Sequence, residues 1–385
     1  MNSKIKVLQV IPKLGYGGAE TGCYDLAHYL AEKDCSSYIA TSGGQLLKFI
    51  KKNKVKVFRL PVHSKNPLFI ILNTFILSVI ILIKRINIVH ARSRAPAWSC
   101  YLACLITRRN FITTFHGTYN FKSNFKKFYN SIMVRSKLTI AGSNFIFNHI
   151  NEKYSKYLNK NKKLRVIFRG INTDYYNKKN ISILKREQLI KDWELYPSRF
   201  TILMPGRLTN WKGQEKLIEA TNILVEDYHN SNFQVIILGS DQGRKVYKKR
   251  LINLVQRYRL NQKIKFIDHC KEMPLAYSVA DAVVSASIEP EAFGRVSVEA
   301  QAMGKPIIAS NLGGSKETIL KEKSGFLYKH DDPRELAKTL NTVIHLDQDA
   351  LNSIGNEGRK NVVKKFDVES MCDSTLREYK KLLNI

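Results

Sequence analysis

Two glutamates, Glu291 and Glu299, stand eight positions apart, and Gly294 between them could open a helix. At ~1.5 Å per residue, Glu299 would lie about 8 Å further along the helix axis than Gly294. The first amides of a helix and its positive end attract phosphate groups. One carboxylate could therefore accept hydrogen bonds from sugar hydroxyls and the other from ribose hydroxyls, with a diphosphate between them. An ordinary strand–helix unit with two surface glutamates would show the same spacing.

The neighbouring residues predict a strand–loop–helix–strand unit around this pair. Ala282-Val-Val284 is an apolar run typical of the end of a buried strand, and Ile307-Ile-Ala309 predicts the next strand. Gly304 and then Pro306 end the helix that lies between them.

A second segment of the same construction supplies positive charge. Phe200-Thr-Ile-Leu-Met204 predicts a buried strand, and the loop after it contains Arg207 and Lys212. Two cations on a loop between a strand and a helix could neutralise a diphosphate leaving group.

Glycines follow the first expected strand, Lys4–Ile11. Gly15-Tyr-Gly17-Gly18 has part of a dinucleotide-binding fingerprint, but Glu20 replaces its third glycine and no acidic residue ends a second strand about 20 positions later. A nicotinamide-dependent enzyme is therefore not expected. The glycines still allow a phosphate or sugar to approach the backbone closely, although a tight turn alone would also explain them.

Three further side chains follow predicted strands of the first half. His116 comes directly after Phe111–Phe115, and Arg92 and Arg94 follow Ile86–His90. Ligands of open α/β sheets bind outside the carboxyl ends of the strands. We therefore expect His116 to contact substrate and the arginines to meet an anionic group, with a structural histidine as the alternative.

Length and composition limit the possible classes of protein. A chain of 385 residues with 44% hydrophobic content can form two domains of ordinary size. The six cysteines contain no CxxC pair, which argues against a zinc site or a disulfide framework and suits a reducing cytosol. The first residues lack the length and the cleavage site of a signal peptide.

The formal net charge of +31 suggests an anionic partner. No Asp or Glu occurs between Cys35 and Asn151, whereas Lys and Arg recur throughout that stretch. A general bias toward Lys, Asn and Ile explains part of the charge. No RNA- or DNA-binding module is recognisable, so an anionic membrane surface is favoured over nucleic acid.

Two segments bear on a membrane. Pro67–Ile83 is apolar apart from Asn73, Thr74 and Ser78, and a bilayer span needs ~20 residues with fewer polar interruptions, so a buried or interfacial helix is favoured over a span. A helix over Phe121–Tyr129 would place aromatic residues beside lysines, as at an anionic interface or as a core-facing stripe with solvated lysines. The predicted acceptor or membrane side comprises Arg92, Arg94, Phe121, Lys122, Phe125, Lys126 and Lys127.

In chain order, these motifs resemble the retaining, nucleotide-sugar-dependent glycosyltransferases of family 4. The motifs are Gly17-Gly18, His116-Gly117, Gly206-Arg207 with Lys212-Gly213, and Glu291 with Glu299. The resemblance covers nearly the whole chain. It implies the α/β GT-B fold, with two facing Rossmann-like domains built on parallel sheets. The implied boundaries are an acceptor-side domain over 1–172, a nucleotide-sugar-binding domain over 173–365, and a last helix over 366–385 that packs back on the first domain.

The resemblance also implies roles for single residues. Arg207 and Lys212 would bind the donor phosphates, Glu299 the ribose and Glu291 the transferred sugar. Near the sugar and diphosphate would lie the backbone amides of Phe293, Gly294, Arg295 and Val296.

In the first domain, the resemblance implies that His116 touches the sugar close to the reacting carbon, and that Gly17 and Gly18 let the domain close over the diphosphate. The sequence departs from the family at Arg169-Gly-Ile-Asn172, where many relatives have Asn-Gly-Val/Ile-Asp, and the role of Arg169 is left open. The implied catalytic residues are Glu291, His116, Arg207 and Lys212.

The resulting hypothesis is sugar transfer to a membrane-linked acceptor, such as lipopolysaccharide core or a glycolipid, and the acid-free first half and the Phe121–Tyr129 helix motivate the membrane part. The transfer would take place at the cytoplasmic face of a bacterial inner membrane, with the enzyme bound peripherally. The family is usually described as using same-face displacement, in which the departing diphosphate helps to deprotonate the acceptor, so leaving-group stabilisation is central. No Asp-x-Asp motif stands in the expected context, so no metal or other cofactor is expected. The alternative is a GT-B-fold epimerase of nucleotide sugars.

Overall fold

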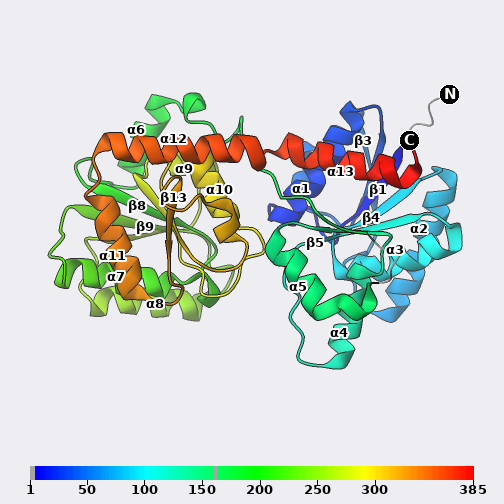
Figure 1. Ribbon diagram of the computed structural model, residues 1–385, viewed down its shortest axis with the longest axis horizontal. Helices are drawn as coiled ribbons and strands as arrows, with labels where there is room; N and C mark the ends of the chain where they lie inside the picture. The colour runs from blue at the N-terminus through cyan, green and yellow to red at the C-terminus, as the bar shows by residue number, and fades with distance from the viewer. Residues whose placement is uncertain (1–4, 159–162) are drawn as a thin grey trace. The chain divides into compact units, whose positions relative to one another are not determined.

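The computed structural model describes residues 5–158 and 163–385, and they form two compact units (Figure 1). Unit 1 comprises Met1–Gly170 together with Val368–Ile385, and unit 2 comprises Ile171–Asp367. The chain therefore leaves unit 1 once and returns to it with its last helix.

Unit 1 contains a parallel seven-stranded sheet in the order β3-β2-β1-β4-β5-β6-β7. Its strands β1, β2, β4, β5 and β6 are buried almost throughout, as expected for a parallel sheet with helices on both faces, whereas β3 and β7 at the two edges are partly exposed. The strands are β1 Lys6–Val10, β2 Ser36–Thr41, β3 Val55–Arg59, β4 Ile88–Ala91, β5 Asn110–Phe115, β6 Leu138–Ala141 and β7 Lys163–Val166.

Unit 1 also contains helices, and two of them, α1 and α13, contribute residues to hydrophobic clusters with the sheet. The helices are α1 Gly18–Glu32, α2 Pro67–Ile83, α3 Arg94–Thr107, α4 Asn124–Asn130, α5 Asn144–Tyr154 and α13 Val368–Leu383. The helix α13, red in Figure 1, lies against α1, and its Leu376 and Tyr379 join Leu26 and Leu30 in one buried cluster.

Unit 2 contains a parallel six-stranded sheet in the order β10-β9-β8-β11-β12-β13. Its strands are β8 Phe200–Pro205, β9 Phe233–Leu238, β10 Ile264–Ile267, β11 Ala282–Ser285, β12 Ile307–Ser310 and β13 Gly325–Tyr328. Its helices are α6 Ile183–Asp192, α7 Gln214–Glu226, α8 Lys245–Arg257, α9 Met273–Ser278, α10 Arg295–Ala302, α11 Pro333–Ile344 and α12 Gln348–Lys365.

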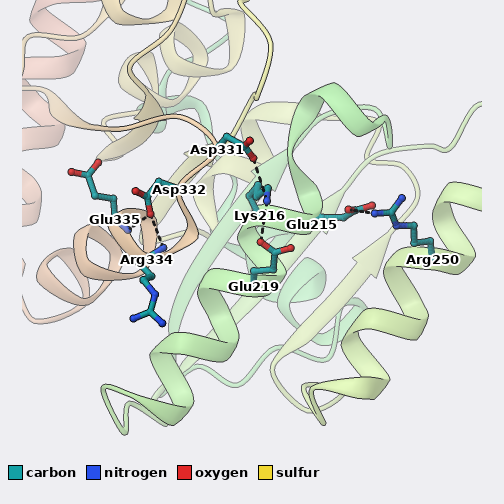
Figure 2. Close-up of polar contacts among 8 residues, drawn as sticks. All are labelled: Glu215, Lys216, Glu219, Arg250, Asp331, Asp332, Arg334 and Glu335. Carbon is teal, nitrogen blue, oxygen red and sulfur yellow. Dashed lines mark hydrogen bonds and ion pairs between the residues drawn. The ribbon is translucent and has the colours of Figure 1, made fainter.

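Polar contacts join the helices on one side of unit 2 (Figure 2). Lys216 on α7 forms ion pairs of 3.2 Å with both Glu219 and Asp331, and Asp331 lies just before α11. The Asp332 side chain caps α11 by accepting hydrogen bonds from the amides of Arg334 and Glu335, as expected for an aspartate followed by a proline at the first helical position. Of these contacts, the Lys216–Asp331 pair links α7 to the residues just before α11.

The predicted strands occur close to their expected positions, but two expectations about elements need correction. The helix predicted over Phe121–Tyr129 begins only at Asn124, because the Ser123 hydroxyl caps it by accepting from the amide of Lys126. Phe121 therefore lies before the helix. The helix α12 was not predicted from the sequence at all.

The apolar segment Pro67–Ile83 forms the single helix α2, as expected for a buried or interfacial element. Asn66 caps it, and Pro67 occupies its first turn. Among the helices of residues 5–158 and 163–385, none combines the length and the apolar character needed to cross a bilayer.

The Tyr379 side chain is fully buried, and its hydroxyl lies 2.5 Å from His90 Nδ1. We expect Tyr379→Ala to lower the free energy of unfolding of unit 1 by about 3–5 kcal/mol, the usual cost of removing a large buried aromatic side chain. Chemical denaturation measures this loss. Tyr16→Ala, at an exposed tyrosine, is the matched control, and equal losses in the two variants would contradict the packing of α13.

Candidate functional site

The candidate site in unit 2 lies where the strand order reverses. Strands β8 and β11 are neighbours although β9 and β10 separate them in the chain, and Ala282 pairs with Ile202. Neighbouring parallel strands end at the same edge of the sheet, which is where ligands bind in open α/β folds. The loop after β8 carries Arg207 and Lys212, and the loop after β11 carries Glu291.

Lys212 and Glu291 meet at this edge in a nearly buried ion pair. Lys212 Nζ lies 2.7 Å from Glu291 Oε1, and the two side chains are 13% and 11% exposed. The Ser287 hydroxyl also donates to Glu291 Oε1 at 2.6 Å, and Lys212 Nζ lies 4.4 Å from the centre of the Trp211 ring. The pair is therefore held from several sides.

Burial acts to raise the pKa of Glu291, but Lys212 outweighs it. The positive charge of Lys212, its hydrogen bond, and those of Ser287 and Ser285 leave the pKa of Glu291 below its usual value. Glu291 is thus a carboxylate at neutral pH, with oxygen lone pairs that can accept sugar hydroxyls.

Glycines bring the two loops into direct contact. Gly213 has φ of +76°, and a Cβ atom there would lie 1.9 Å from the carbonyl oxygen of Ala286, directly after β11. The amide of Ile288 also donates to the carbonyl of Trp211 at 2.9 Å. The position of Lys212 is therefore set by backbone contacts and not only by its own side chain.

Arg207 differs from Lys212 in having no acidic partner. Its side chain is exposed, and no ion pair to it occurs among residues 5–158 and 163–385. Its carbonyl accepts from Gln214 Nε2 at 2.9 Å, which ties the loop to the start of α7. Arg207 is thus an uncompensated cation on the same loop as the Lys212–Glu291 pair.

The helix α10 begins as expected, immediately after Gly294. Gly294 has φ of +90°, and a Cβ atom there would lie 2.6 Å from Ser315 Cα. Phe293 is buried and packs against Phe366, so its side chain is structural while its backbone precedes the helix. The first amides of the helix, which include those of Arg295 and Val296, lack acceptors within it and suit an anionic ligand.

Glu299 is buried and already hydrogen-bonded. Its Oε1 accepts from Tyr176 at 2.9 Å and from Arg295 Nε at 2.6 Å, and its Oε2 accepts from Tyr277 at 2.8 Å. Although burial acts to lower the pKa of Arg295, the charge of Glu299 raises it, so Arg295 stays protonated. The ribose-binding role of Glu299 stays a prediction, and both tyrosines were missed because their positions carry no motif.

In unit 1, the structure places His116 beside Arg169. Arg169 Nη1 lies 3.1 Å from His116 Nδ1, and Arg169 Nη2 donates to the carbonyl of Gly18. Because a guanidinium only donates, His116 Nδ1 must accept, and the ring proton resides on Nε2. His116 Nε2 is buried and has no hydrogen-bond partner in the described part of the chain.

Burial holds the pKa of His116 well below its usual range, and the charges of Arg169, Arg92 and His90 lower it further. His116 is therefore neutral at physiological pH, and its Nε2–H can donate to a ligand. The small size of Gly18 makes room for Arg169, since a Cβ atom there would lie 3.3 Å from Arg169 Nη2. The deviation from the family motif at Arg169 was the sequence signal for this contact.

Two arginines of the predicted acceptor or membrane side, Arg92 and Arg94, already have hydrogen-bond partners within unit 1. Arg92 is buried, and its guanidinium donates to Gln9 Oε1 at 2.7 Å and to the carbonyl of Gly22 at 2.9 Å, so it does not face a ligand as predicted. Arg94 donates to Asn130 Oδ1 and lies 4.3 Å from the centre of the Tyr119 ring.

Of the remaining residues on that predicted side, Phe125 is 80% exposed. Lys127 Nζ lies 5.0 Å from the centre of the Phe121 ring, while Lys122 and Lys126 are exposed. Phe128 and Tyr129, which share α4, pack near Trp98 of α3.

Comparison with known proteins identifies the family. The model of glycosyltransferase family 4 matches residues 16–175, and the model of glycosyl transferases group 1 matches residues 185–361. A glycosyltransferase of known crystal structure from Rickettsia africae ESF-5 is 36% identical, with a TM-score of 0.90 and 99% of each chain covered.

Two further relatives are more distant. HepE of Anabaena, solved in complex with UDP and glucose, is 22% identical, with a TM-score of 0.81 over 98% of this chain and 100% of that one. The capsular polysaccharide biosynthesis glycosyltransferase CapM of Staphylococcus aureus is 28% identical over 193 residues, which are 48% of this chain and 49% of CapM. The chain thus spans about half the length of CapM.

The chain belongs to the glycosyltransferases that carry group 1 and family 4 domains. The predicted fold class is confirmed, because the two units are Rossmann-like parallel-sheet domains that match GT-B glycosyltransferase structures.

We expect Arg169→Gln to raise the pKa of His116 toward its ordinary value of ~6.5, since the adjacent positive charge is removed while burial persists. Titration of ¹⁵N-histidine-labelled protein by NMR measures both this pKa and the tautomer, and the resonance that is lost in His116→Gln identifies His116. In Arg169→Gln we also expect the His116 tautomer that carries its proton on Nδ1 to become detectable.

The same substitution bears on stability. A histidine with a lowered folded-state pKa makes unit 1 less stable as pH falls below ~6.5, because the unfolded chain binds the proton more readily. Arg169→Gln should lessen that loss. Arg165→Gln, at an exposed arginine of β7, is the control; if both variants left the His116 resonances unchanged, the assigned contact would be wrong.

Proposed function

We propose that this glycosyltransferase moves a sugar from a nucleotide-diphosphate donor to a membrane-linked acceptor with retention of anomeric configuration. The observation that carries the donor part is the uncompensated charge of Arg207 on the loop that also holds the Lys212–Glu291 pair. The complex of HepE with UDP and glucose supports a nucleotide-sugar donor by similarity of fold.

In this proposal, the bound donor replaces some of the hydrogen bonds that the side chains of unit 2 form with one another. The diphosphate binds Arg207, takes over part of the hydrogen bonding of Lys212, and meets the first amides of α10. Glu291 then accepts hydrogen bonds from hydroxyls of the transferred sugar. As the bond to the diphosphate breaks, negative charge grows on the leaving group, and Arg207 and Lys212 stabilise it.

Retention by a covalent route would require a carboxylate nucleophile against the anomeric carbon. Glu291 is instead engaged by Lys212 and Ser287 through the same oxygen, which suits hydroxyl binding better than attack. We therefore favour same-face displacement, with the departing diphosphate taking the acceptor proton. His116 donates through Nε2 to a sugar oxygen and stays neutral.

A lipid-linked saccharide, such as lipopolysaccharide core or a glycolipid, is the proposed acceptor. The acid-free stretch from Cys35 to Asn151 and the exposed Phe125 on α4 support a site close to an anionic membrane. The named role of CapM in capsular polysaccharide biosynthesis fits a cell-envelope acceptor. The proposed location is the cytoplasmic face of a bacterial plasma membrane, with peripheral binding.

The epimerase alternative gains no support from the comparisons, since both matching family models describe glycosyltransferases. Incubation of the protein with donor alone separates the two activities. An epimerase would interconvert the sugar without acceptor, whereas a transferase would at most hydrolyse the donor slowly.

We expect a cognate nucleotide sugar, found by screening a panel, to raise the thermal unfolding temperature, because a ligand that binds only the folded state stabilises it. Arg207→Ala should bind this donor at least roughly tenfold more weakly, given the strength of charge-assisted contacts to phosphate. Arg334→Ala, at an exposed arginine of α11, is the matched control. Equal donor binding by Arg207→Ala and wild type would refute the phosphate-binding role.

We expect turnover to persist in excess EDTA, since side chains and backbone amides stabilise the charge of the leaving group in this proposal. We also expect the product to keep the anomeric configuration of the donor. The anomeric proton coupling in the NMR spectrum of fresh product reports the configuration. An inverted product would contradict retention, and complete loss of turnover in chelator that added Mg²⁺ restores would contradict metal independence.

A further inference from the structure

The helix α2 in unit 1 presents a continuous apolar face to solvent. Leu68, Leu72, Phe75, Val79 and Leu82 follow one another at helical spacing along this face, and all are exposed, Leu68 by 74% and Phe75 by 62%. The whole helix contains no charged residue. We define the outer face of α2 as Leu68, Phe69, Ile71, Leu72, Phe75, Val79, Leu82 and Ile83.

The polar residues of α2 point the opposite way. Asn73, Thr74 and Ser78 are buried, whereas a helix on a water-facing surface normally exposes such residues. Asn73 Nδ2 donates to the carbonyl of Pro61 at 3.2 Å, and Ser78 Oγ donates to the carbonyl of Thr74 at 2.8 Å. The helix is thus inverted relative to the usual pattern of a soluble protein.

The inverted helix is firmly attached to unit 1. Leu77 and Ile81 on its inner side are fully buried, and α3 packs along it (Figure 1), with Ser99 Oγ donating to the carbonyl of Ile70 at 3.1 Å. The adjacent α3 leaves Leu105 and Ile106 exposed as well. A contiguous apolar patch of this kind on a folded surface marks an interaction site.

The charges that flank α2 and α3 in the chain indicate what the outer face binds. Lys65 precedes α2, Lys84 and Arg85 follow it, and the pair Arg108-Arg109 follows α3. No acidic residue occurs anywhere from Cys35 to Asn151 to balance them. A second copy of this chain would bring the same positive charges, which repel, whereas an anionic bilayer offers acyl chains for the apolar side chains and headgroups for the cations.

We propose that the outer face of α2 is a membrane-docking surface, which lies in the boundary between headgroups and acyl chains of an anionic bilayer while Lys65, Lys84 and Arg85 bind the headgroups. A helix of 17 residues at ~1.5 Å per residue lies along the interface over about 25 Å. The surface is separate from the residues proposed to bind donor, so the inference does not rest on the transfer reaction. It places the main contact on α2 instead of on the aromatic and basic residues of α4.

Flotation of the full chain with vesicles of phosphatidylglycerol and phosphatidylcholine tests the proposal. We expect wild type to bind these vesicles and to bind pure phosphatidylcholine at least roughly tenfold less, because the anionic lipid supplies the headgroup attraction. Phe75→Ser with Val79→Ser should lose at least about tenfold in binding to the anionic vesicles. Ile183→Ser with Leu184→Ser, at two apolar residues of unit 2 that are even more exposed than Phe75 and Val79, is the matched control and should bind as wild type does.

Four outcomes overturn the proposal. In the first, wild type does not float with the vesicles. In the second, the α2 variant (Phe75→Ser with Val79→Ser) floats as well as wild type. In the third, sedimentation shows a dimer that the α2 variant abolishes, and neither protein binds vesicles. In the fourth, Phe125→Ser alone abolishes binding, which would place the surface on α4.

A second measurement guards against loss of folding in the α2 variant. Phe75→Trp should show a blue-shifted emission that brominated acyl chains quench, and absence of quenching contradicts insertion. Donor-induced thermal stabilisation should be the same in wild type and the α2 variant, so a failure of vesicle binding is distinguishable from a failure of the proposed transfer.

Discussion

The ion pair between Lys212 and Glu291 is the contact on which the candidate site depends. Removing two charges from water costs free energy, and such a pair is stable only when further hydrogen bonds and close packing surround it. Ser287, the Trp211 ring and the contact of Gly213 with Ala286 supply that surrounding. Because both charges need partners, a ligand can separate the pair only if it supplies new ones. A donor does so, since its phosphate can bind Lys212 and its sugar hydroxyls can bind Glu291.

The two predicted glutamates differ in how freely they can exchange partners. Glu299 is held by Tyr176, Tyr277 and Arg295 from three different segments of unit 2, so it acts as a fixed point of the structure. Glu291 has a lysine as its main partner, and a flexible lysine can turn toward a phosphate. Glu299 is therefore held rigidly, whereas Glu291, eight residues before it, can change partners when a ligand binds.

Much of the fold follows from the sequence because the buried strands consist mostly of apolar residues, and because Gly304 and Pro306 mark the end of α10. The strand order does not follow, and it places the loops that carry Lys212 and Glu291, 79 positions apart, at the same edge of the sheet. The exposure of the apolar face of α2 could not be predicted from the sequence either, because Asn73, Thr74 and Ser78 would normally mark the solvent side of a helix. Arg92 seemed a ligand-binding cation until the structure showed Gln9 and the Gly22 carbonyl as its partners.

Calorimetric titration with a nucleoside diphosphate and with the matching nucleotide sugar tests the central claim most directly. If a diphosphate competes with Glu291 for Lys212, then Glu291→Gln should bind the nucleoside diphosphate at least as tightly as wild type does, yet bind the nucleotide sugar more weakly. Lys212→Met should weaken binding of both ligands. The account would be contradicted if Lys212→Met bound the nucleoside diphosphate with unchanged affinity. It would also be contradicted if Glu291→Gln no longer bound the nucleoside diphosphate.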